Sequence, residues 1–106
     1  MKNFEFEIQS IVSQIINNYN PQKIILFGSC ALENNSAESD IDLLIIKETK
    51  KRPIERIHEV HIPLEYNIPL DILVYTPQEV ETFSNNNKSF INKILKEGKL
   101  LYEQAV

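Results

Sequence analysis

Apolar positions follow two different patterns along the chain. Near the N-terminus they recur every three to four residues, which is the spacing of one face of an amphipathic helix; these positions are Phe4, Ile8, Ile11, Val12, Ile15, Ile16 and Tyr19. Asn20 and Pro21 are expected to end that helix. Later in the chain come short apolar runs rich in β-branched residues, namely KIILF at 23–27, IDLLII at 41–46 and LDILVY at 70–75. Such runs predict buried strands.

Further helices are predicted after the second and third strands. The first begins at Pro53, because proline suits the first helical position. Its expected buried residues are Ile54, Ile57 and Val60. TPQE at 76–79 has the form of a capping box with proline at the first helical position, and it predicts the start of another helix. A last helix is expected from 89 to 97, with Gly98 as its C-terminal cap. Its expected buried residues are Phe90, Ile91, Ile94 and Leu95.

Polar residues stand where the predicted strands end and begin. Gly28 and Ser29 follow the first strand, Asp40 and Asp42 begin the second, and Asp71 begins the third. Side chains two positions apart on a strand point to the same face, so Asp40 and Asp42 share one. Carboxylates beside so apolar a run carry a desolvation cost that a structural role seldom justifies. A bound divalent cation such as Mg²⁺, which prefers oxygen ligands, would offset that cost.

The same residues predict the strand directions. If Ser29 meets Asp40 and Asp42, the first two strands run antiparallel. If Asp71 joins this cluster, the second and third strands run parallel, and a parallel pair needs a long crossover. The segment 47–69 is long enough to supply it. We therefore expect an α/β (α+β) protein with a small mixed three-stranded sheet packed against helices.

Composition narrows the class of protein. The 106 residues predict one domain, 1–106, and a content of 42% hydrophobic and 25% charged residues is ordinary for a globular protein. The apolar runs are too short to span a membrane, no secretion signal begins the chain, and Cys30 is the single cysteine. We therefore expect a cytoplasmic protein without a membrane partner. The net charge of −4 argues against a direct nucleic-acid partner.

Several motifs together resemble a known family. They are FGS at 27–29, Ala31, SDIDLLI at 39–45, LDILVY at 70–75 and EGKLLY at 97–102. In this combination and order the chain resembles the minimal nucleotidyltransferases of the DNA polymerase beta superfamily, which are usually encoded beside a HEPN-domain partner. The resemblance extends over nearly the whole chain and implies a polymerase-beta-like nucleotidyltransferase core.

The resemblance also implies roles for the polar residues. Asp40 and Asp42 would bind two Mg²⁺ ions, and Asp71 would complete the site of the ion that activates the nucleophile. Gly28 would let the backbone approach a nucleotide phosphate, and Ser29 would donate hydrogen bonds to it. The alternative interpretation of these aspartates is that Asp40 is a turn residue and that Asp42 and Asp71 are polar residues at the beginning of strands.

The chain departs from the family pattern directly after Gly-Ser. Many members carry an arginine there and a glycine a few residues later, whereas this chain has Cys30 and the residues LEN at 32–34. These positions lie in or beside a helical turn expected at 29–33. The missing arginine removes a contact to phosphate or to a partner, and Cys30 is interpreted as a small buried hydrophobic residue.

The resemblance implies a reaction and a partner. The partner is a HEPN-domain toxin, neutralised by transfer of AMP from the substrate ATP to one of its tyrosines. A chain of 106 residues leaves no room for an acceptor-binding domain, so we expect a partner protein to present the acceptor in a hetero-oligomer. Two alternatives stay open: a non-catalytic antitoxin that occludes its partner, and an enzyme that modifies a free small molecule. The intact Gly-Ser and aspartates favour the enzyme, and the missing arginine favours occlusion.

Two other polar groups invite a functional interpretation. His58 and His61 lack the spacing of a zinc-protease helix and are expected on a partly exposed helix face. The basic run at 47–52 is expected to be a solvated turn, and its alternative is a patch for an acidic partner or a phosphate.

Overall fold

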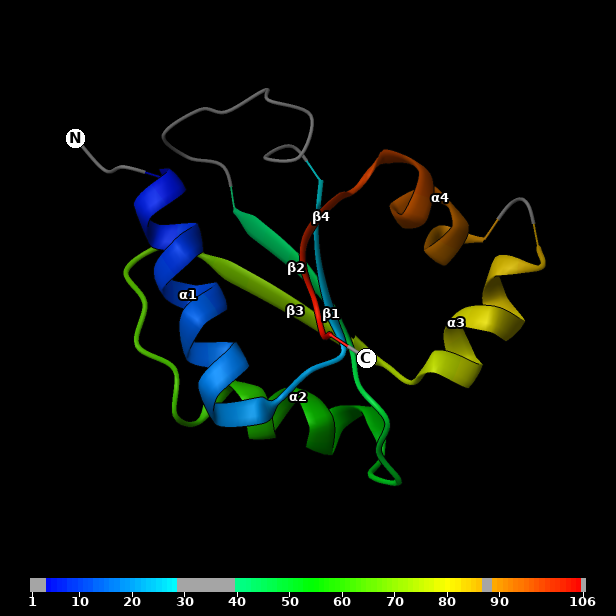
Figure 1. Ribbon diagram of the computed structural model, residues 1–106, viewed down its shortest axis with the longest axis horizontal. Coiled ribbons are helices and arrows are strands. Elements are labelled where there is room, and N and C mark those ends of the chain that lie inside the picture. The colour runs from blue at the N-terminus through cyan, green and yellow to red at the C-terminus, as the bar shows by residue number, and fades with distance from the viewer. Residues whose placement is uncertain (1–3, 29–39, 87–88, 106) are drawn as a thin grey trace.

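Within residues 4–28, 40–86 and 89–105, which the computed structural model describes, four strands form one mixed sheet in the order β3-β2-β1-β4 (Figure 1). They are β1 (Lys23–Phe27), β2 (Ile41–Ile46), β3 (Leu70–Tyr75) and β4 (Lys99–Glu103). β1 pairs antiparallel with β2 and with β4, and β2 pairs parallel with β3. The predicted directions of the first three strands are therefore confirmed.

The prediction of a three-stranded sheet is wrong, because β4 adds a fourth strand. Its sequence, KLLYE, lacks the long apolar run that predicts a buried strand, and all five of its residues are exposed or half-buried. β4 pairs with β1 on the side opposite to β2, and the register of this pairing shifts between Ile24 and Ile25. It thereby covers backbone groups that would otherwise stay unpaired at an open sheet edge.

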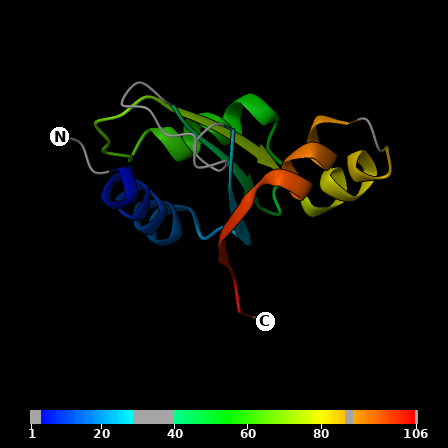
Figure 2. The same ribbon diagram turned by 90° about the horizontal axis from the view of Figure 1, so that it is seen from above.

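The helices cover opposite faces of this sheet. α1 (Phe4–Tyr19) and α2 (Pro53–His61) lie on one face, and α3 (Pro77–Ser84) and α4 (Phe90–Glu97) lie on the other (Figures 1 and 2). Alternation of strand side chains divides the core accordingly. The α1/α2 face buries Ile24, Leu26, Ile41, Leu43, Ile45, Ile72 and Val74, and the α3/α4 face buries Ile25, Leu44 and Ile46. No helix in the described part of the chain is both long enough and apolar enough to cross a membrane.

Several residues predicted to be buried are exposed. Ile54 on α2 is 57% exposed, and on α4 Phe90 is 55% and Leu95 39% exposed, so these predictions are wrong. The expected burial is confirmed for Val60, Ile91 and Ile94. Helical spacing shows which residues share a face, but the partner elements decide which part of that face is covered.

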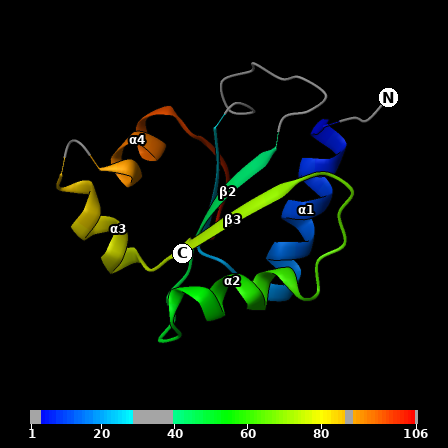
Figure 3. The ribbon, with the colours of Figure 1, turned by 180° about the vertical axis from the view of Figure 1, so that it is seen from behind.

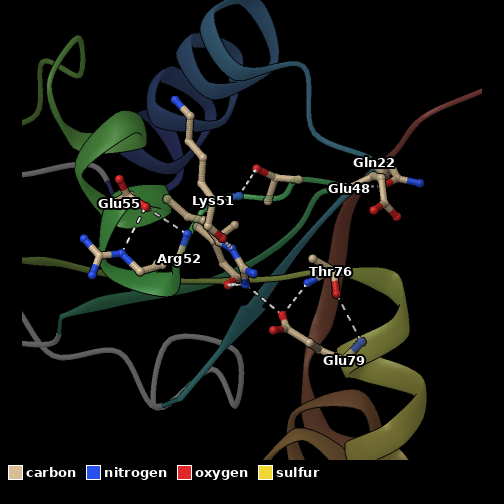
Figure 4. A network of polar contacts seen from close by, with 10 residues as sticks. Gln22, Glu48, Lys51, Arg52, Glu55, Thr76 and Glu79 are labelled. Atoms are coloured by element: carbon tan, nitrogen blue, oxygen red, sulfur yellow. Dashed lines mark hydrogen bonds and ion pairs between the residues drawn. The ribbon is translucent and has the colours of Figure 1, made fainter.

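Arg56 is the unexpected buried residue of α2. Its Nη1 donates to Glu79 Oε1 at 2.7 Å and to the carbonyl oxygen of Val74 at 3.2 Å, and its Nε donates to the carbonyl oxygen of Lys51 at 2.7 Å. Glu79 also accepts from the amide of Thr76 at 2.8 Å, while Thr76 Oγ1 accepts from the amide of Glu79 at 3.2 Å (Figure 4). The predicted capping box is confirmed, and it is joined to α2 through an ion pair.

The basic run at 47–52 is only partly a solvated turn. Lys47 is half-buried, and its Nζ donates to the carbonyl oxygens of Tyr19 at 2.8 Å and of Asn20 at 3.0 Å. It thus satisfies carbonyl groups at the end of α1, where a cation is also favoured by the helix dipole. Lys51 and Arg52 are exposed and pair with glutamates of α2.

Gly98 ends α4 as predicted, but not through a left-handed conformation. Its φ is −74°. A Cβ at this position would lie 2.5 Å from the carbonyl oxygen of Ile94 and 2.6 Å from Ile25 Cγ2. Close packing of the α4–β4 connection against β1 is therefore the reason that glycine suits this position.

Candidate active site

Two of the predicted site residues are direct neighbours in the sheet. Asp42 is the second residue of β2 and Asp71 the second of β3, and the parallel pairing places them opposite each other. Because Leu43 and Ile72 pack toward α1, both aspartates lie on the α3/α4 face. β2 and β3 begin at the same end of the sheet, with β3 at its edge (Figure 3).

The end of β1 lies beside these aspartates. Phe27, its last residue, is opposite Asp42 in the antiparallel pairing, and Gly28 follows it. The φ of Gly28 is +78°, a conformation that residues with a Cβ rarely adopt. A Cβ on Gly28 would also overlap Asp42 Oδ2 and would lie 3.3 Å from Asp42 Cγ. The positive φ is therefore the reason that glycine suits this position, and a Cβ would in addition displace the Asp42 carboxylate, which lies directly against the backbone of the turn.

The electrostatics of the pair are unfavourable for two ionised carboxylates. The pKa of Asp42 is raised from 3.8 to about 6. Burial is the largest cause, followed by the negative charge of Asp71, a hydrogen bond with the Asp71 carboxyl group and the negative charge of Asp40. A cation bound between the carboxylates would relieve this repulsion and lower the pKa again.

Asp40 takes a different position from the other two aspartates. It precedes β2 and is exposed, and its charge reaches Asp42. Among the residues that the structure describes, no three His, Cys, Asp or Glu side chains are gathered closely enough to hold a metal ion. The predicted convergence of three carboxylates is thus met by Asp42 and Asp71, while Asp40 does not complete a group of three.

Other predicted features of this site lie outside the described residues. They are Ser29, Cys30, the helical turn expected at 29–33 and the polar residues that follow it, up to position 39. Their proposed contacts to phosphate therefore stay predictions from the sequence.

The donor set at Asp42 and Asp71 fits a hard divalent cation. Both side chains offer carboxylate oxygen only, which suits Mg²⁺, Mn²⁺ or Ca²⁺ better than softer metals. The close approach of Gly28 leaves no Cβ in front of the Asp42 carboxylate. The two histidines of α2 belong to the opposite face of the sheet, where His58 is exposed and His61 is half-buried, as predicted for a helix face.

Sequence reasoning missed an aromatic pair beside the aspartates. The rings of Phe27 and Phe90 meet edge to face, with centroids 5.8 Å apart and planes at 83°. Phe90 was expected to be a core residue of α4, yet more than half of it is exposed. Nothing in the local pattern distinguishes it from a core position, since its contact with β1 is long-range.

The sequence of this chain matches a known protein family and a named relative. Residues 9–105 match the family model described as Polymerase beta, Nucleotidyltransferase. A relative from Methanocaldococcus jannaschii, named as protein adenylyltransferase MJ0604, is 32% identical over 103 residues, which cover 94% of this chain and 99% of the relative.

Two solved structures share the fold. One is a crystal structure from Sulfolobus solfataricus, named as that of a nucleotidyltransferase, with a TM-score of 0.64 and 18% identity, covering 95% of this chain and 86% of the other. The other is a crystal structure of a toxin-antitoxin with AMP-PNP, with a TM-score of 0.55 and 19% identity, covering 91% of this chain and 73% of that one. At such identities the likeness concerns the fold alone.

Proposed function

Because the chain belongs to the Polymerase beta nucleotidyltransferase family, we propose that it transfers AMP from ATP to a hydroxyl group of a partner protein. The observation that carries this proposal is the pairing of Asp42 with Asp71 against the backbone of Gly28. The name of the M. jannaschii relative, a protein adenylyltransferase, supports a protein as the acceptor.

The proposed roles follow from the chemistry of the residues. Asp42 and Asp71 would hold Mg²⁺, and Asp40, which lies apart from them without the metal, would complete the ligands of two ions only once these are bound. Gly28 and Ser29 would receive the phosphates of ATP. Bound there, Mg²⁺ lowers the pKa of the acceptor hydroxyl and neutralises charge on the triphosphate. The acceptor oxygen bonds to the α-phosphorus while the bond from that phosphorus to the bridging oxygen breaks. Pyrophosphate leaves, and the hydroxyl proton passes to solvent.

The proposed partner is a HEPN-domain toxin, with a tyrosine hydroxyl as acceptor. The sequence resemblance implies this pairing, and the likeness of fold to a toxin-antitoxin crystallised with AMP-PNP supports it. The chain would then act as the antitoxin in a hetero-oligomer with its toxin. The hydroxyl oxygen of a tyrosine near the active site of the toxin would carry the transferred AMP in place of its proton, and the toxin would be neutralised.

The test combines the protein with the product of the neighbouring gene, Mg²⁺ and ATP labelled on the α-phosphate. We expect label on the partner and release of pyrophosphate. Asp42→Asn and Asp71→Asn should each reduce the transfer rate by about 100-fold or more, because each removes a metal ligand. Glu81→Gln, which changes an exposed carboxylate on α3, is the matched control and should leave the rate unchanged.

The second candidate is an antitoxin that neutralises its partner by occlusion without chemistry. Cys30 at the position of the usual arginine favours it. Neutralisation that survives Asp42→Asn, with no label on the partner, would establish occlusion and contradict the transfer reaction. Turnover of ATP with a small hydroxyl compound and no protein acceptor would contradict both antitoxin functions.

A further inference from the structure

We propose that Phe90 and Phe27 form the subsite for the base of the bound nucleotide, with the exposed ring of Phe90 as the stacking surface. This inference rests on the proposed function, because it takes the triphosphate to lie at Asp42 and Asp71. It assigns a binding role to Phe90 at the beginning of α4, a residue outside the family motifs.

The first step is the position of Phe27. It lies opposite Asp42 across the β1–β2 pair, and directly opposite residues have their side chains on the same face. Phe27 packs against the cluster of Ile25, Leu44 and Ile46 on the α3/α4 face. The ring is thus fixed one strand away from the Asp42 carboxylate, on the same face of the sheet.

The second step is the position of Phe90. Its ring contacts that of Phe27 edge to face at 5.8 Å, yet its side chain is among the exposed large hydrophobic ones, at 55%. Its backbone is well held, since Ile91 and Ile94 of the same helix are buried against the sheet. The Ser89 hydroxyl accepts from the amide of Asn92 at 3.0 Å and caps the helix start. Phe90 therefore has an aromatic ring exposed to solvent on a backbone that the helix cap and the buried isoleucines hold in place.

The third step is the match to a nucleotide. Phe27 connects the two groups, because it lies opposite Asp42 and its ring contacts that of Phe90. A nucleotide whose phosphates lie at Asp42 extends away from them through its ribose to its base, and the exposed ring of Phe90 would be a surface for that base. Bases stack on aromatic side chains with favourable free energy, and stacking tolerates different bases because each has a π-face. Neither phenylalanine has a polar side-chain atom, so this subsite would select by ring area and not by hydrogen bonds.

A second aromatic pair provides a matched control within the same chain. The rings of Tyr75 and Phe83 also meet edge to face, at 5.7 Å and 68°, and Phe83 is 44% exposed. Tyr75 lies on the same face of the sheet but ends β3, whereas Asp71 is near its beginning. Phe83 thus resembles Phe90 in exposure and ring contact, and differs in its distance from the aspartates.

Fluorescence provides the most direct test, because the chain contains no tryptophan. Phe90→Trp and Phe83→Trp each introduce a single indole reporter. Mg²⁺ with ATP should quench the emission of Trp in the Phe90→Trp variant, because the base stacks on the indole. Mg²⁺ with inorganic tripolyphosphate, which has no base, should leave that emission nearly unchanged. Neither probe should quench the Phe83→Trp variant.

Affinities provide the second measurement. Phe90→Leu should weaken binding of Mg²⁺-ATP by about five- to tenfold and leave the affinity for Mg²⁺-tripolyphosphate unchanged. Phe83→Leu should change neither affinity, and Phe90→Tyr, which keeps the ring, should bind ATP like the wild type. Thermal unfolding of each variant shows that it is folded.

The possible failures are distinguishable. If the wild-type protein binds tripolyphosphate and ATP with Mg²⁺ but Phe90→Leu affects both equally or neither, the base subsite is wrong and the proposed function stands. If the wild type binds neither probe, the nucleotide site itself is wrong, and the subsite is overturned with it. Equal quenching in the two tryptophan variants would also overturn the subsite.

Discussion

Asp42 is the residue at which the stability of the fold and the proposed chemistry are in conflict. Its carboxylate is half-buried, lies against the Gly28 backbone and faces Asp71. The resulting pKa of about 6, against 3.8 for a free side chain, means that the folded protein binds this proton more tightly than the unfolded chain does. The stabilisation from that proton is complete below about pH 4 and is lost as the pH rises through about 6.

In the absence of divalent cations, Asp42→Asn should therefore stabilise the protein at pH 8. The free energy of unfolding should increase by about 1 kcal/mol. This value is smaller than the pKa shift of Asp42 alone would give, because solvent screens the charge of a half-exposed group. The increase should vanish below pH 4, where Asp42 is protonated in both states. Urea unfolding in EDTA between pH 4 and pH 8 measures this difference.

Added Mg²⁺ should make the wild type more stable than Asp42→Asn at pH 8, because the cation binds the wild-type carboxylates only in the folded state. Glu81→Gln serves as the control, since it removes an exposed carboxylate on α3 and should show neither effect. An Asp42→Asn variant that is less stable than wild type at pH 8 in EDTA would contradict the repulsion inferred here.

The ion pair of Arg56 and Glu79 joins two elements on opposite faces of the sheet, α2 and α3. The Arg56 side chain is only 7% exposed, so its charge depends on Glu79 and on two backbone carbonyls. Partial burial alone would raise the pKa of Glu79, but hydrogen bonds from Arg56 and from the Thr76 amide outweigh it, and the pKa is lowered. The pair therefore stabilises the fold above the usual pKa of a glutamate and loses this effect as the pH falls.

Glu79→Gln should destabilise the protein by about 3 kcal/mol at neutral pH, because it leaves the Arg56 charge buried without a counter-ion. Glutamine can still complete the capping box, so the loss reports the ion pair and not the helix cap. Urea unfolding at neutral pH measures it. The exposed pair of Lys23 and Glu103, at 3.3 Å, provides the control, and Glu103→Gln should cost less than about 0.5 kcal/mol.

A double variant completes this test. Arg56→Met combined with Glu79→Gln removes the stranded charge and should recover part of the loss. If the two substitutions are simply additive, the ion pair does not couple α2 to α3.

The overall charge of the protein argues against nucleic acid as a ligand. The net charge is −4, and the candidate site adds an aspartate pair at one end of the sheet. A nucleic-acid backbone needs a surface of lysine and arginine side chains, and its binding weakens steeply with salt. The polymerase-like fold therefore does not imply a DNA-binding function for this chain.

We expect a labelled DNA duplex to bind with a Kd weaker than about 10⁻⁴ M at physiological salt. Fluorescence anisotropy at low and at physiological salt measures this, with a basic DNA-binding protein as the positive control. Salt-sensitive binding in the submicromolar range would contradict the expectation.

Local patterns in the sequence determined a large part of this protein. Residue periodicity and strand length identified α1 and the first three strands, and proline and capping residues located the starts of α2 and α3. The premise that Asp71 joins the other aspartates predicted parallel second and third strands, and the structure has both this parallel pairing and Asp71 opposite Asp42. The requirement for glycine at position 28 also follows from its place after a strand, at a turn.

Tertiary structure alone decided the rest, because it depends on contacts between residues far apart in the chain. β4 pairs with the edge of β1 that β2 leaves open. Arg56 is buried because its charge is paired with Glu79 of another helix. Phe90 is exposed beside Phe27 because α4 packs on the sheet through Ile91 and Ile94. Periodicity shows which residues share a face of a helix or strand, but it does not show which other element covers that face. For the same reason, the pair of carboxylates could be predicted from the sequence, and the aromatic surface next to it could not.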